Sequence, residues 1–109
     1  MKNNYQDLVY ECTRKIPSGQ VCTYGIIADF LGLGSARMVG WALNKSFQIE
    51  PPVPAHRVVN RKGELSGRNH FADPTIMQSL LEEEGIIIKQ DKVMELESVL
   101  WRPQIEDFD

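Results

Sequence analysis

"TYGIIADFLGLGSARMVGWALN", residues 23–44, contains the clearest structural signals in this chain. Thr23 is a helix-capping residue, and the apolar residues after it recur at helical spacing for two turns. Gly32-Leu33-Gly34 is a turn sequence, and Ser35 is positioned to cap a second helix over about residues 36–45. Two short helices joined by a glycine turn form a helix-turn-helix pattern, although many small helical domains contain such a pair without touching DNA. The side chains expected to face inward are Ile26, Ile27, Phe30 and Leu31 in the first helix and Met38, Val39, Ala42 and Leu43 in the second.

The segments on either side of this pair predict one more helix and little sheet. Residues 4–15 carry apolar side chains at helical spacing, and Pro17-Ser18-Gly19 ends that helix. Residues 20–22 are compatible with an extended segment. Residues 51–68 predict a loop with short extended pieces, in which Val58-Val59 is the expected buried pair.

The C-terminal third predicts a fourth helix and a packed tail. Asp73-Pro74 combines a capping residue with a proline at the first helical position, and Gly85 ends the helix. The triplet at 86–88 favours a short strand, and residues 101–103 a packed terminal segment before an acidic, frayed end. The predicted fold class is mainly α with a helix-turn-helix and little β structure, which is compatible with a winged-helix-like DNA-binding domain. The expected inward face of the fourth helix is Ile76, Met77, Leu80 and Leu81.

Length and composition are those of one soluble domain, expected to span residues 1–109. Apolar residues make up 42% of the chain and charged residues 25%. No apolar run reaches the roughly 18 residues that a membrane helix needs, and the N-terminus lacks an apolar signal core. Cys12 and Cys22 have no metal-site spacing and suit a reducing compartment, so we expect a cytoplasmic protein (nucleoid-associated in a bacterium) without metal or cofactor. No dimerisation segment is evident, so a monomer is expected.

Charge is distributed unevenly along the chain. The net charge is −3, yet the segment from Arg14 to Arg68 holds eight basic residues against three acidic ones. From Asn69 onward three basic residues face ten acidic ones. This asymmetry predicts a basic face that suits a polyanionic partner, with chance clustering on a solvated surface as the alternative.

Several spaced motifs, taken in order, resemble one known family. Over about residues 5–88 the chain is similar to the C-terminal DNA-binding domain of the O6-alkylguanine-DNA alkyltransferases. A set of motifs in one order is more specific than any single motif. The matching motifs are Ile16-Pro17-Ser18-Gly19-Gln20-Val21, Thr23-Tyr24-Gly25, Ala28, Gly32, Ala36-Arg37-Met38-Val39-Gly40, Pro54-Ala55-His56-Arg57-Val58-Val59 and Leu80-Leu81-Glu82-Glu83-Glu84-Gly85.

Ala55 is where the chain departs from the enzymes of that family. The family's cysteine at this position takes the alkyl group as a thiolate, and alanine has neither a lone pair nor an ionisable proton. The chain is therefore similar to the alkyltransferase-like subgroup, which lacks that cysteine. Arg68, within residues 65–69, stands where the enzymes carry a Tyr-x-Gly-Gly stretch and fits this subgroup, as does the ending at 100–103. The resemblance implies a protein that is not an enzyme.

The resemblance implies roles for three DNA-facing side chains. Tyr24 is expected to crowd a phosphate and help rotate a nucleotide out of the duplex, its alternative being inward packing of the ring. Arg37 is expected to enter the minor groove and fill the vacated space, its alternative being an ordinary phosphate contact. Arg68 is expected to sense the altered electrostatics of the alkylated base, its alternative being an ordinary loop arginine.

The remaining site residues follow from the same resemblance. His56 and Glu84 match the general base of the enzymes and its supporting glutamate, and without a thiol we expect them to be structural. The predicted DNA-binding residues are Tyr24, Ala36, Arg37, Gly40, Asn44 and Arg68. The predicted lesion pocket is made of Tyr24, Ala55, His56, Arg57, Val58 and Arg68.

The function implied by the resemblance is recognition of DNA damage without repair chemistry. The expected partners are double-stranded DNA containing O6-alkylguanine and the proteins of nucleotide excision repair, to which the lesion is handed on. Two rivals remain open. One is an active alkyltransferase that uses a different cysteine. The other is a sequence-specific helix-turn-helix regulator, which would prefer a particular undamaged site.

Overall fold

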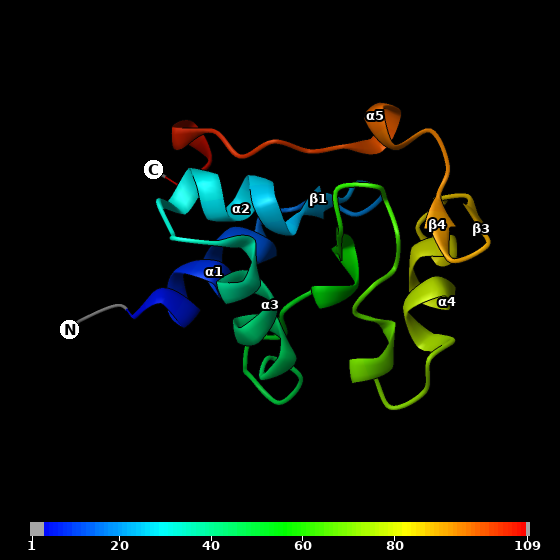
Figure 1. Ribbon diagram of the computed structural model, residues 1–109, viewed down its shortest axis with the longest axis horizontal. Coiled ribbons are helices and arrows are strands. Elements are labelled where there is room, and N and C mark those ends of the chain that lie inside the picture. Colours follow the sequence, from blue (N-terminus) through cyan, green and yellow to red (C-terminus); the bar gives the residue numbers. More distant parts are fainter. Residues whose placement is uncertain (1–3, 109) are drawn as a thin grey trace.

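The computed structural model describes residues 4–108, which form helices joined by loops and two short strand pairs (Figure 1). The predicted mainly α fold with little β structure is confirmed. The α-helices are α1 (Tyr5–Arg14), α2 (Tyr24–Leu31), α3 (Ala36–Asn44), α4 (Ile76–Glu83) and α5 (Leu96–Val99). The strands are β1 (Cys22–Thr23), β2 (Val58–Val59), β3 (Ile88–Lys89) and β4 (Lys92–Val93), and the 3-10 helices are η1 (Ala55–Arg57), η2 (Arg68–His70) and η3 (Ile105–Phe108).

The predicted helix-turn-helix is α2 followed by α3. The Thr23 side chain accepts a hydrogen bond of 3.1 Å from the Ile26 amide and so caps α2. Gly32 ends α2 in the left-handed conformation, with φ of 71°. Ser35 precedes α3 as expected, but its side chain makes no capping hydrogen bond. The two helices are bent by 106° relative to each other, within the range of helix-turn-helix pairs.

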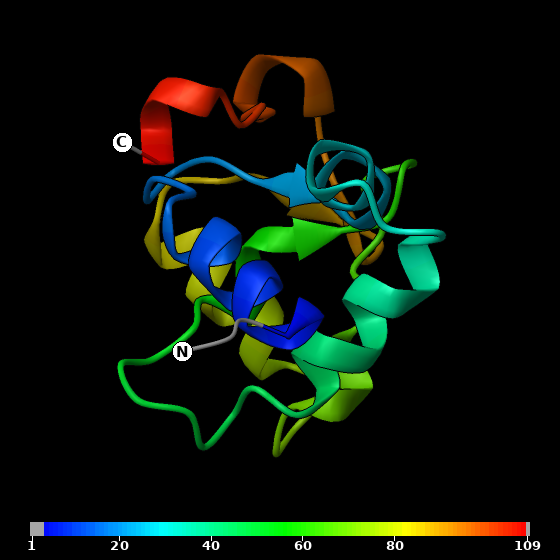
Figure 2. The same ribbon diagram turned by 90° about the vertical axis from the view of Figure 1, so that its left-hand side faces the viewer.

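Two hydrophobic clusters form the core, and the β1–β2 pair contributes residues to them. Figure 2 shows the two strands side by side near the centre of the molecule. The strands are parallel, with Cys22 opposite Val58 and Thr23 opposite Val59. Because side chains alternate along a strand, Val58 packs into the cluster beneath α1, α2 and α3, whereas Val59 packs into the cluster beneath α4. The prediction that these two valines are a buried pair is confirmed, since neither is accessible to solvent.

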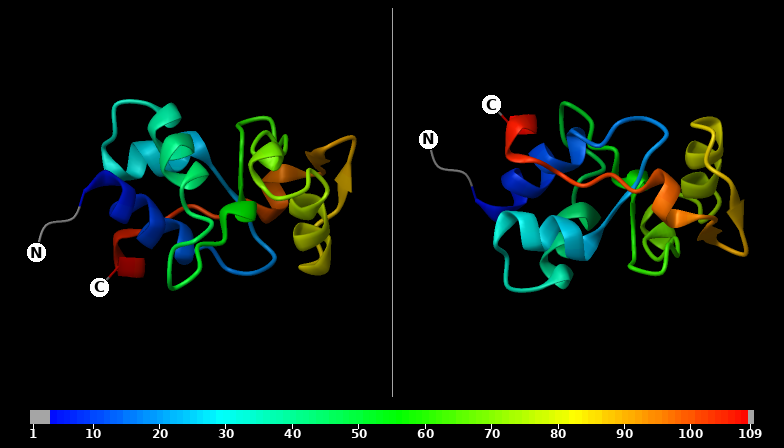
Figure 3. Two further views of the ribbon diagram at one scale, coloured as in Figure 1. Left: turned by 90° about the horizontal axis from the view of Figure 1, so that it is seen from below. Right: turned by 90° about the horizontal axis from the view of Figure 1, so that it is seen from above.

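The C-terminal segment runs the length of the molecule as a packed strap (Figure 3). It is attached at Val21, whose amide donates to the Val99 carbonyl at 2.9 Å and whose carbonyl accepts from the Trp101 amide at 2.7 Å. Near its end the Phe108 ring lies 5.3 Å from the Phe30 ring, centroid to centroid. The expectation of a frayed end is therefore wrong up to Phe108, and Asp109 lies outside the described residues.

The start of α4 also differs from the prediction. The Asp73 carboxylate accepts hydrogen bonds from the Thr75 amide at 2.7 Å and from its hydroxyl at 2.6 Å. These bonds close a local turn over residues 73–75, so the helix begins at Ile76 rather than at Pro74. The triplet at 86–88 contributes only its last residue to a strand, β3, which forms an antiparallel hairpin with β4.

The expected inward faces are confirmed in part. Among the residues predicted to face inward, Ile27, Val39, Ala42, Leu43, Met77 and Leu81 are buried, while Ile26, Phe30, Leu31, Met38, Ile76 and Leu80 are half-buried. No single helix among residues 4–108 has the length and apolar character to cross a membrane. Only α2 and α3 together meet that requirement, and they are sharply bent.

Candidate nucleic-acid interface

The outer face of α3 is largely exposed and carries small and polar residues together with one tryptophan, because the opposite face of the helix fills the core. Val39, Ala42 and Leu43 are buried against α1 and α2. Helical periodicity therefore turns two rows of side chains to solvent, spaced four residues apart. The first row is Ala36, Gly40 and Asn44; the second is Arg37 and Trp41.

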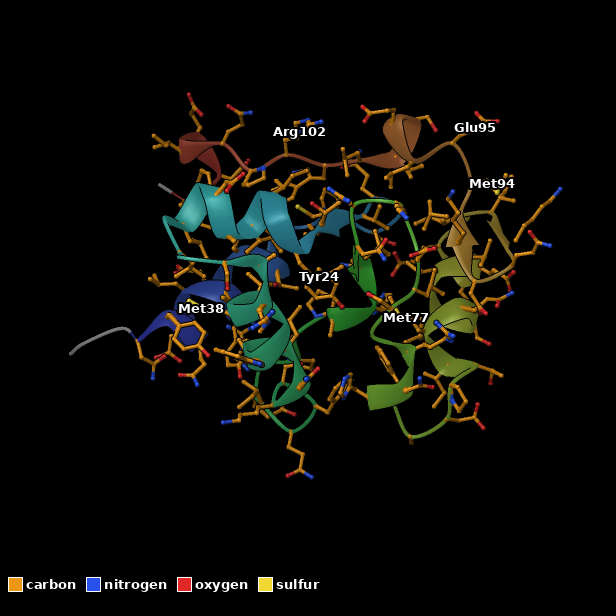
Figure 4. All side chains as sticks on the ribbon, in the orientation of Figure 1. Tyr24, Met38, Met77, Met94, Glu95 and Arg102 are labelled. Atoms are coloured by element: carbon orange, nitrogen blue, oxygen red, sulfur yellow. The ribbon has the colours of Figure 1, made fainter. Side chains whose placement is uncertain are left out.

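A hollow of about 330 Å³ lies between this face of α3 and the loop over residues 66–70. We call it the α3 hollow. Tyr24 extends from the start of α2 toward it and lies near the middle of the molecule (Figure 4). Five of the six predicted DNA-binding residues line this one hollow. Its lining is Tyr24, Ala36, Arg37, Gly40, Trp41, Asn44, Ser66, Gly67 and His70.

The Tyr24 phenol is held against the loop by close contacts. Burial raises its pKa above the ordinary value, and a hydrogen bond with the Ser66 side chain opposes that rise only in part. A Cβ atom added to Gly67 would lie 2.8 Å from the Tyr24 hydroxyl oxygen, which is too close. Only glycine at position 67 therefore leaves the phenol in this place.

The backbone of α3 at Gly40 is open to a close approach. A Cβ atom built at Gly40 would meet nothing within 4 Å, so the protein itself does not require glycine there. Arg37, on the neighbouring row, is exposed, and its guanidinium makes no hydrogen bond or ion pair with any residue in the range 4–108. A helix face with a bare backbone position beside an unpaired guanidinium suits a polyanionic ligand that approaches closely.

Arg68 lies outside the α3 hollow, in contrast to the other five residues. Its guanidinium donates to the Leu65 carbonyl at 3.0 Å and lies 3.9 Å from the Asp91 carboxylate. It lines a separate hollow of about 320 Å³ with Ser66, Asp91 and residues beside them. Ser66 lines both hollows, so the two are neighbours.

Ala55 opens into a third hollow, of about 630 Å³, which we call the Ala55 hollow. Its walls are largely apolar, and Phe47 and Phe71 meet there edge to face with centroids 4.8 Å apart. Val58 lines none of these hollows, because its side chain is fully buried in the core. The lining of the Ala55 hollow is Arg14, Phe47, Pro52, Val53, Pro54, Ala55, His56, Arg57, Phe71 and Leu80.

The predicted lesion-pocket residues are thus not gathered into one cavity. Tyr24 lies in the α3 hollow, Arg68 beside Asp91, and Ala55 with its two neighbours in the Ala55 hollow. The predicted basic face is also reduced, because some of its cations turn inward. Arg14 donates to the Pro51 carbonyl at 2.7 Å, and Arg57 is engaged by Glu84.

Glu84 is the centre of a hydrogen-bond network, called the Glu84 network below, that holds η1, the 3-10 helix that contains Ala55. Its carboxylate lies 2.8 Å from His56 Nε2, and it accepts from the Arg57 guanidinium at 2.7 Å and from the Gly19 amide at 3.0 Å. Arg57 also donates to the Ile16 carbonyl at 2.9 Å. The network joins η1, the end of α4 and the turn after α1.

The pKa values in this network follow from its geometry. Burial alone would raise the pKa of Glu84, but hydrogen bonds from Arg57, His56 and the Gly19 amide lower it to about 2. Burial lowers the pKa of His56, and the neighbouring Glu84 offsets this only in part. His56 is therefore neutral at neutral pH and donates its Nε2 proton to Glu84.

Neither cysteine is available as a nucleophile. Cys12 and Cys22 are completely buried in the hydrophobic cluster beneath α1, α2 and α3. Burial raises the pKa of Cys12 to about 12 and that of Cys22 to about 11, so both are protonated thiols at neutral pH.

Sequence reasoning missed four residues of the α3 hollow: Trp41, Ser66, Gly67 and His70. Trp41 follows Arg37 by four residues, so helical periodicity alone places it on the same face. The other three belong to a loop that folds back over Tyr24, and no local pattern predicts that approach.

The structure is thus that of a helix-turn-helix domain whose second helix has an exposed outer face beside a hollow. Residues 4–86 match the family described as 6-O-methylguanine DNA methyltransferase, DNA binding domain. The chain belongs to this family, which confirms the resemblance inferred from its motifs.

The similar proteins include both an alkyltransferase-like protein and a methyltransferase. The chain is 41% identical over 100 residues to alkyltransferase-like protein 1 of Schizosaccharomyces pombe, covering 87% of this chain and 92% of that protein. It is 47% identical over 85 residues to a methylated-DNA–protein-cysteine methyltransferase of Shigella flexneri, covering 77% of this chain and 48% of that enzyme. The chain thus spans about half the length of the enzyme.

The structure is also similar to a solved protein–DNA complex. This is S. pombe Atl1 in complex with damaged DNA containing O6-carboxymethylguanine. The two share a TM-score of 0.81 and 36% sequence identity, over 94% of this chain and 100% of that one.

Proposed function

We propose that this protein binds DNA that contains O6-alkylguanine and marks the lesion without repairing it. The observation that carries the proposal is Ala55 in the Pro-Ala-His-Arg motif, together with an exposed α3 face. The chain combines a surface suited to DNA with a position that cannot accept an alkyl group. The similarity to a protein solved with O6-carboxymethylguanine DNA supports the same reading.

The first step of the proposed mechanism is nucleotide flipping by Tyr24 and Arg37. With α3 against the minor groove, Gly40 lets the backbone approach closely, and Tyr24 meets the sugar-phosphate chain at the floor of the α3 hollow. The exposed guanidinium of Arg37 enters the stack and pairs with the orphaned base, which offsets part of the unstacking cost of a few kcal/mol. A pair already weakened by alkylation flips at lower cost, which gives one source of selectivity.

The second step is inspection of the flipped base by Arg68. Its long side chain is held by only one carbonyl and a 3.9 Å contact with Asp91, so little is lost when it turns toward the base. A donor-only cation interacts differently with guanine and with alkylguanine, because alkylation removes the proton on N1.

In this proposal the role of Ala55 is steric: its small side chain leaves space for the alkyl substituent and does not react with it. A methyl group at this position leaves space beside the apolar walls of the Ala55 hollow for the alkyl substituent. The neighbouring His56 and Arg57 are engaged by Glu84 and hold the loop in place. With Cys12 and Cys22 buried and protonated, transfer to another cysteine has no available acceptor. The proposal extends to handover of the marked site to nucleotide excision repair proteins.

The deciding experiment compares two duplexes that differ only in one O6-methylguanine. We expect tighter binding to the modified duplex in fluorescence-anisotropy titrations, and an unchanged intact protein mass after incubation. Equal affinity for both duplexes would refute lesion recognition. A gain of one methyl group in the mass spectrum would instead establish an alkyltransferase. Preference for one undamaged sequence, unaffected by the modification, would establish a regulator.

A further inference from the structure

We propose that Trp41 is a DNA-contacting residue whose indole packs against the deoxyriboses of a duplex bound along α3. The inference rests on the proposed function for the identity of its ligand and adds a contact that does not depend on the lesion. Trp41 lies on the outer face of α3 and lines the α3 hollow with Tyr24 and Arg37.

Trp41 keeps a large apolar surface in contact with solvent. It is 52% exposed, although tryptophan releases more free energy on burial than almost any other residue. It cannot turn inward, because Val39, Ala42 and Leu43 already occupy the buried face of the helix. A ligand that covers the outer face of α3 is therefore what would bury it.

The surroundings of Trp41 identify the kind of ligand. Arg37 precedes it by four residues and Lys45 follows it by four, and both are exposed. The indole thus lies between an exposed arginine one turn earlier on α3 and an exposed lysine at the C-terminal cap of the helix. A nucleic acid strand has matching chemistry, since anionic phosphates alternate with the apolar faces of the sugars. Gly40, beside Trp41, leaves room for the backbone of that strand to approach.

The chemistry of this contact sets its functional consequence. Deoxyribose is the same in damaged and intact DNA, so Trp41 contributes equally to binding of both. Apolar side chains in minor-groove proteins commonly act in this way, packing in the groove or wedging between base steps. Trp41 therefore sets overall affinity, whereas Arg68 sets the preference for the lesion.

The chain offers an experiment that leaves Trp41 itself unchanged. The protein contains two tryptophans, Trp41 and Trp101, so the Trp101→Phe variant has Trp41 as its only indole. Its emission is followed while the O6-methylguanine duplex and the matched undamaged duplex are added, with anisotropy of labelled DNA reporting binding. We expect the emission of Trp41 to change at saturation with either duplex.

Substitution provides the second measurement. Trp41→Ala should lower affinity for both duplexes about tenfold and leave their ratio unchanged, and Trp41→Phe should lower it less. Ile87→Ala is the matched control: Ile87 is 63% exposed but precedes β3, next to the second cluster, and its loss should leave both affinities unchanged. Circular dichroism confirms that each variant is folded.

The outcomes separate this inference from the proposed function. Unchanged emission of Trp41 in a saturated complex overturns the inference, as does a loss of affinity confined to the modified duplex. If the parent protein binds both duplexes equally while Trp41 still responds and Trp41→Ala still weakens both, lesion recognition fails and the contact stands. If neither duplex binds at all, both fail.

Discussion

Arg37 at the α3 hollow and the side chains of the Glu84 network differ in whether the protein itself supplies their hydrogen-bond partners. Around the hollow, Arg37 is exposed, and its guanidinium makes no hydrogen bond or ion pair within residues 4–108. In the network, the Glu84 carboxylate accepts hydrogen bonds from His56, Arg57 and the Gly19 amide. Both regions carry residues for which the family resemblance implied a function.

If Arg37 binds DNA as proposed, the difference predicts separate effects of substitution in the two regions. An unpaired cation on a helix face loses nothing within the protein when DNA takes it up. A buried carboxylate with three partners costs free energy if any of them is removed. Substitution of Arg37 should therefore change DNA affinity with little effect on stability, and substitutions in the Glu84 network should do the reverse.

The largest effect is expected from acid. The folded pKa of Glu84 is about 2 against an ordinary 4.5, so the network stabilises the fold above pH 4.5 and is lost as the pH falls toward 2. This loss amounts to about 3 kcal/mol in the free energy of unfolding. His56, with a pKa below its ordinary 6.5, adds a loss of the same sign as the pH falls below that value.

Urea unfolding at a series of pH values measures this dependence, and Glu84→Gln is its control. The variant should be less stable than the wild type at neutral pH, and its stability should vary less between pH 4.5 and 2. An equally steep dependence in the variant would place the acid sensitivity elsewhere in the protein.

Arg37→Ala tests the other side of the comparison. Loss of the guanidinium should weaken binding to the O6-methylguanine duplex about thirtyfold, since both its stacking and its charge-assisted hydrogen bonds disappear. The midpoint of thermal unfolding should stay within about one degree, because Arg37 is exposed and has no partner among the described residues. A large drop in that midpoint would show that the residue has a structural role.

Tyr24 should show a graded effect. Removal of the ring in Tyr24→Ala should weaken lesion binding about tenfold, whereas Tyr24→Phe keeps the ring and loses only the hydroxyl, for an effect of about threefold. Anisotropy titrations of the two variants give the ratio. If the two variants bind alike, the hydroxyl and not the ring is what matters.

Gly67→Ala sharpens the geometry around that hydroxyl. The added Cβ would lie 2.8 Å from the Tyr24 oxygen and must displace the phenol, which should weaken lesion binding a few-fold. In a Tyr24→Phe background the oxygen is absent, so Gly67→Ala should have less effect there. A double-mutant cycle measures the coupling, and strict additivity would contradict it.

Local signals predicted the α3 face well. The helical period places Arg37 and Gly40 on the outer face of one helix, whereas the expectation that these residues and Tyr24 contact DNA came from the family resemblance. Position along a helix determines which side chains share a face, so no long-range information was needed. The buried pair at β2 was predictable for a similar reason, since two adjacent valines in a loop segment have few alternatives to burial.

Long-range contacts account for what the sequence did not predict. Arg68 turns toward Asp91 because the β3–β4 turn holds Gln90 and Asp91 in the left-handed region, with φ of 53° and 60°. No sequence rule places two such non-glycine residues there. The packed C-terminus depends on the contact of Phe108 with Phe30, which lies 78 positions earlier in the sequence.

The β1–β2 pair contributes residues to both hydrophobic clusters and so connects them. Thr23 is the last residue of β1 and caps α2. Tyr24, the proposed flipping residue, follows Thr23 directly and is therefore attached to the strand pair that joins the two clusters. If DNA contacts Tyr24 as proposed, we expect the contact to restrain both strands of the pair. The amides of β1 and β2 should accordingly exchange hydrogen more slowly in the DNA complex than in the free protein, although neither strand lines the α3 hollow.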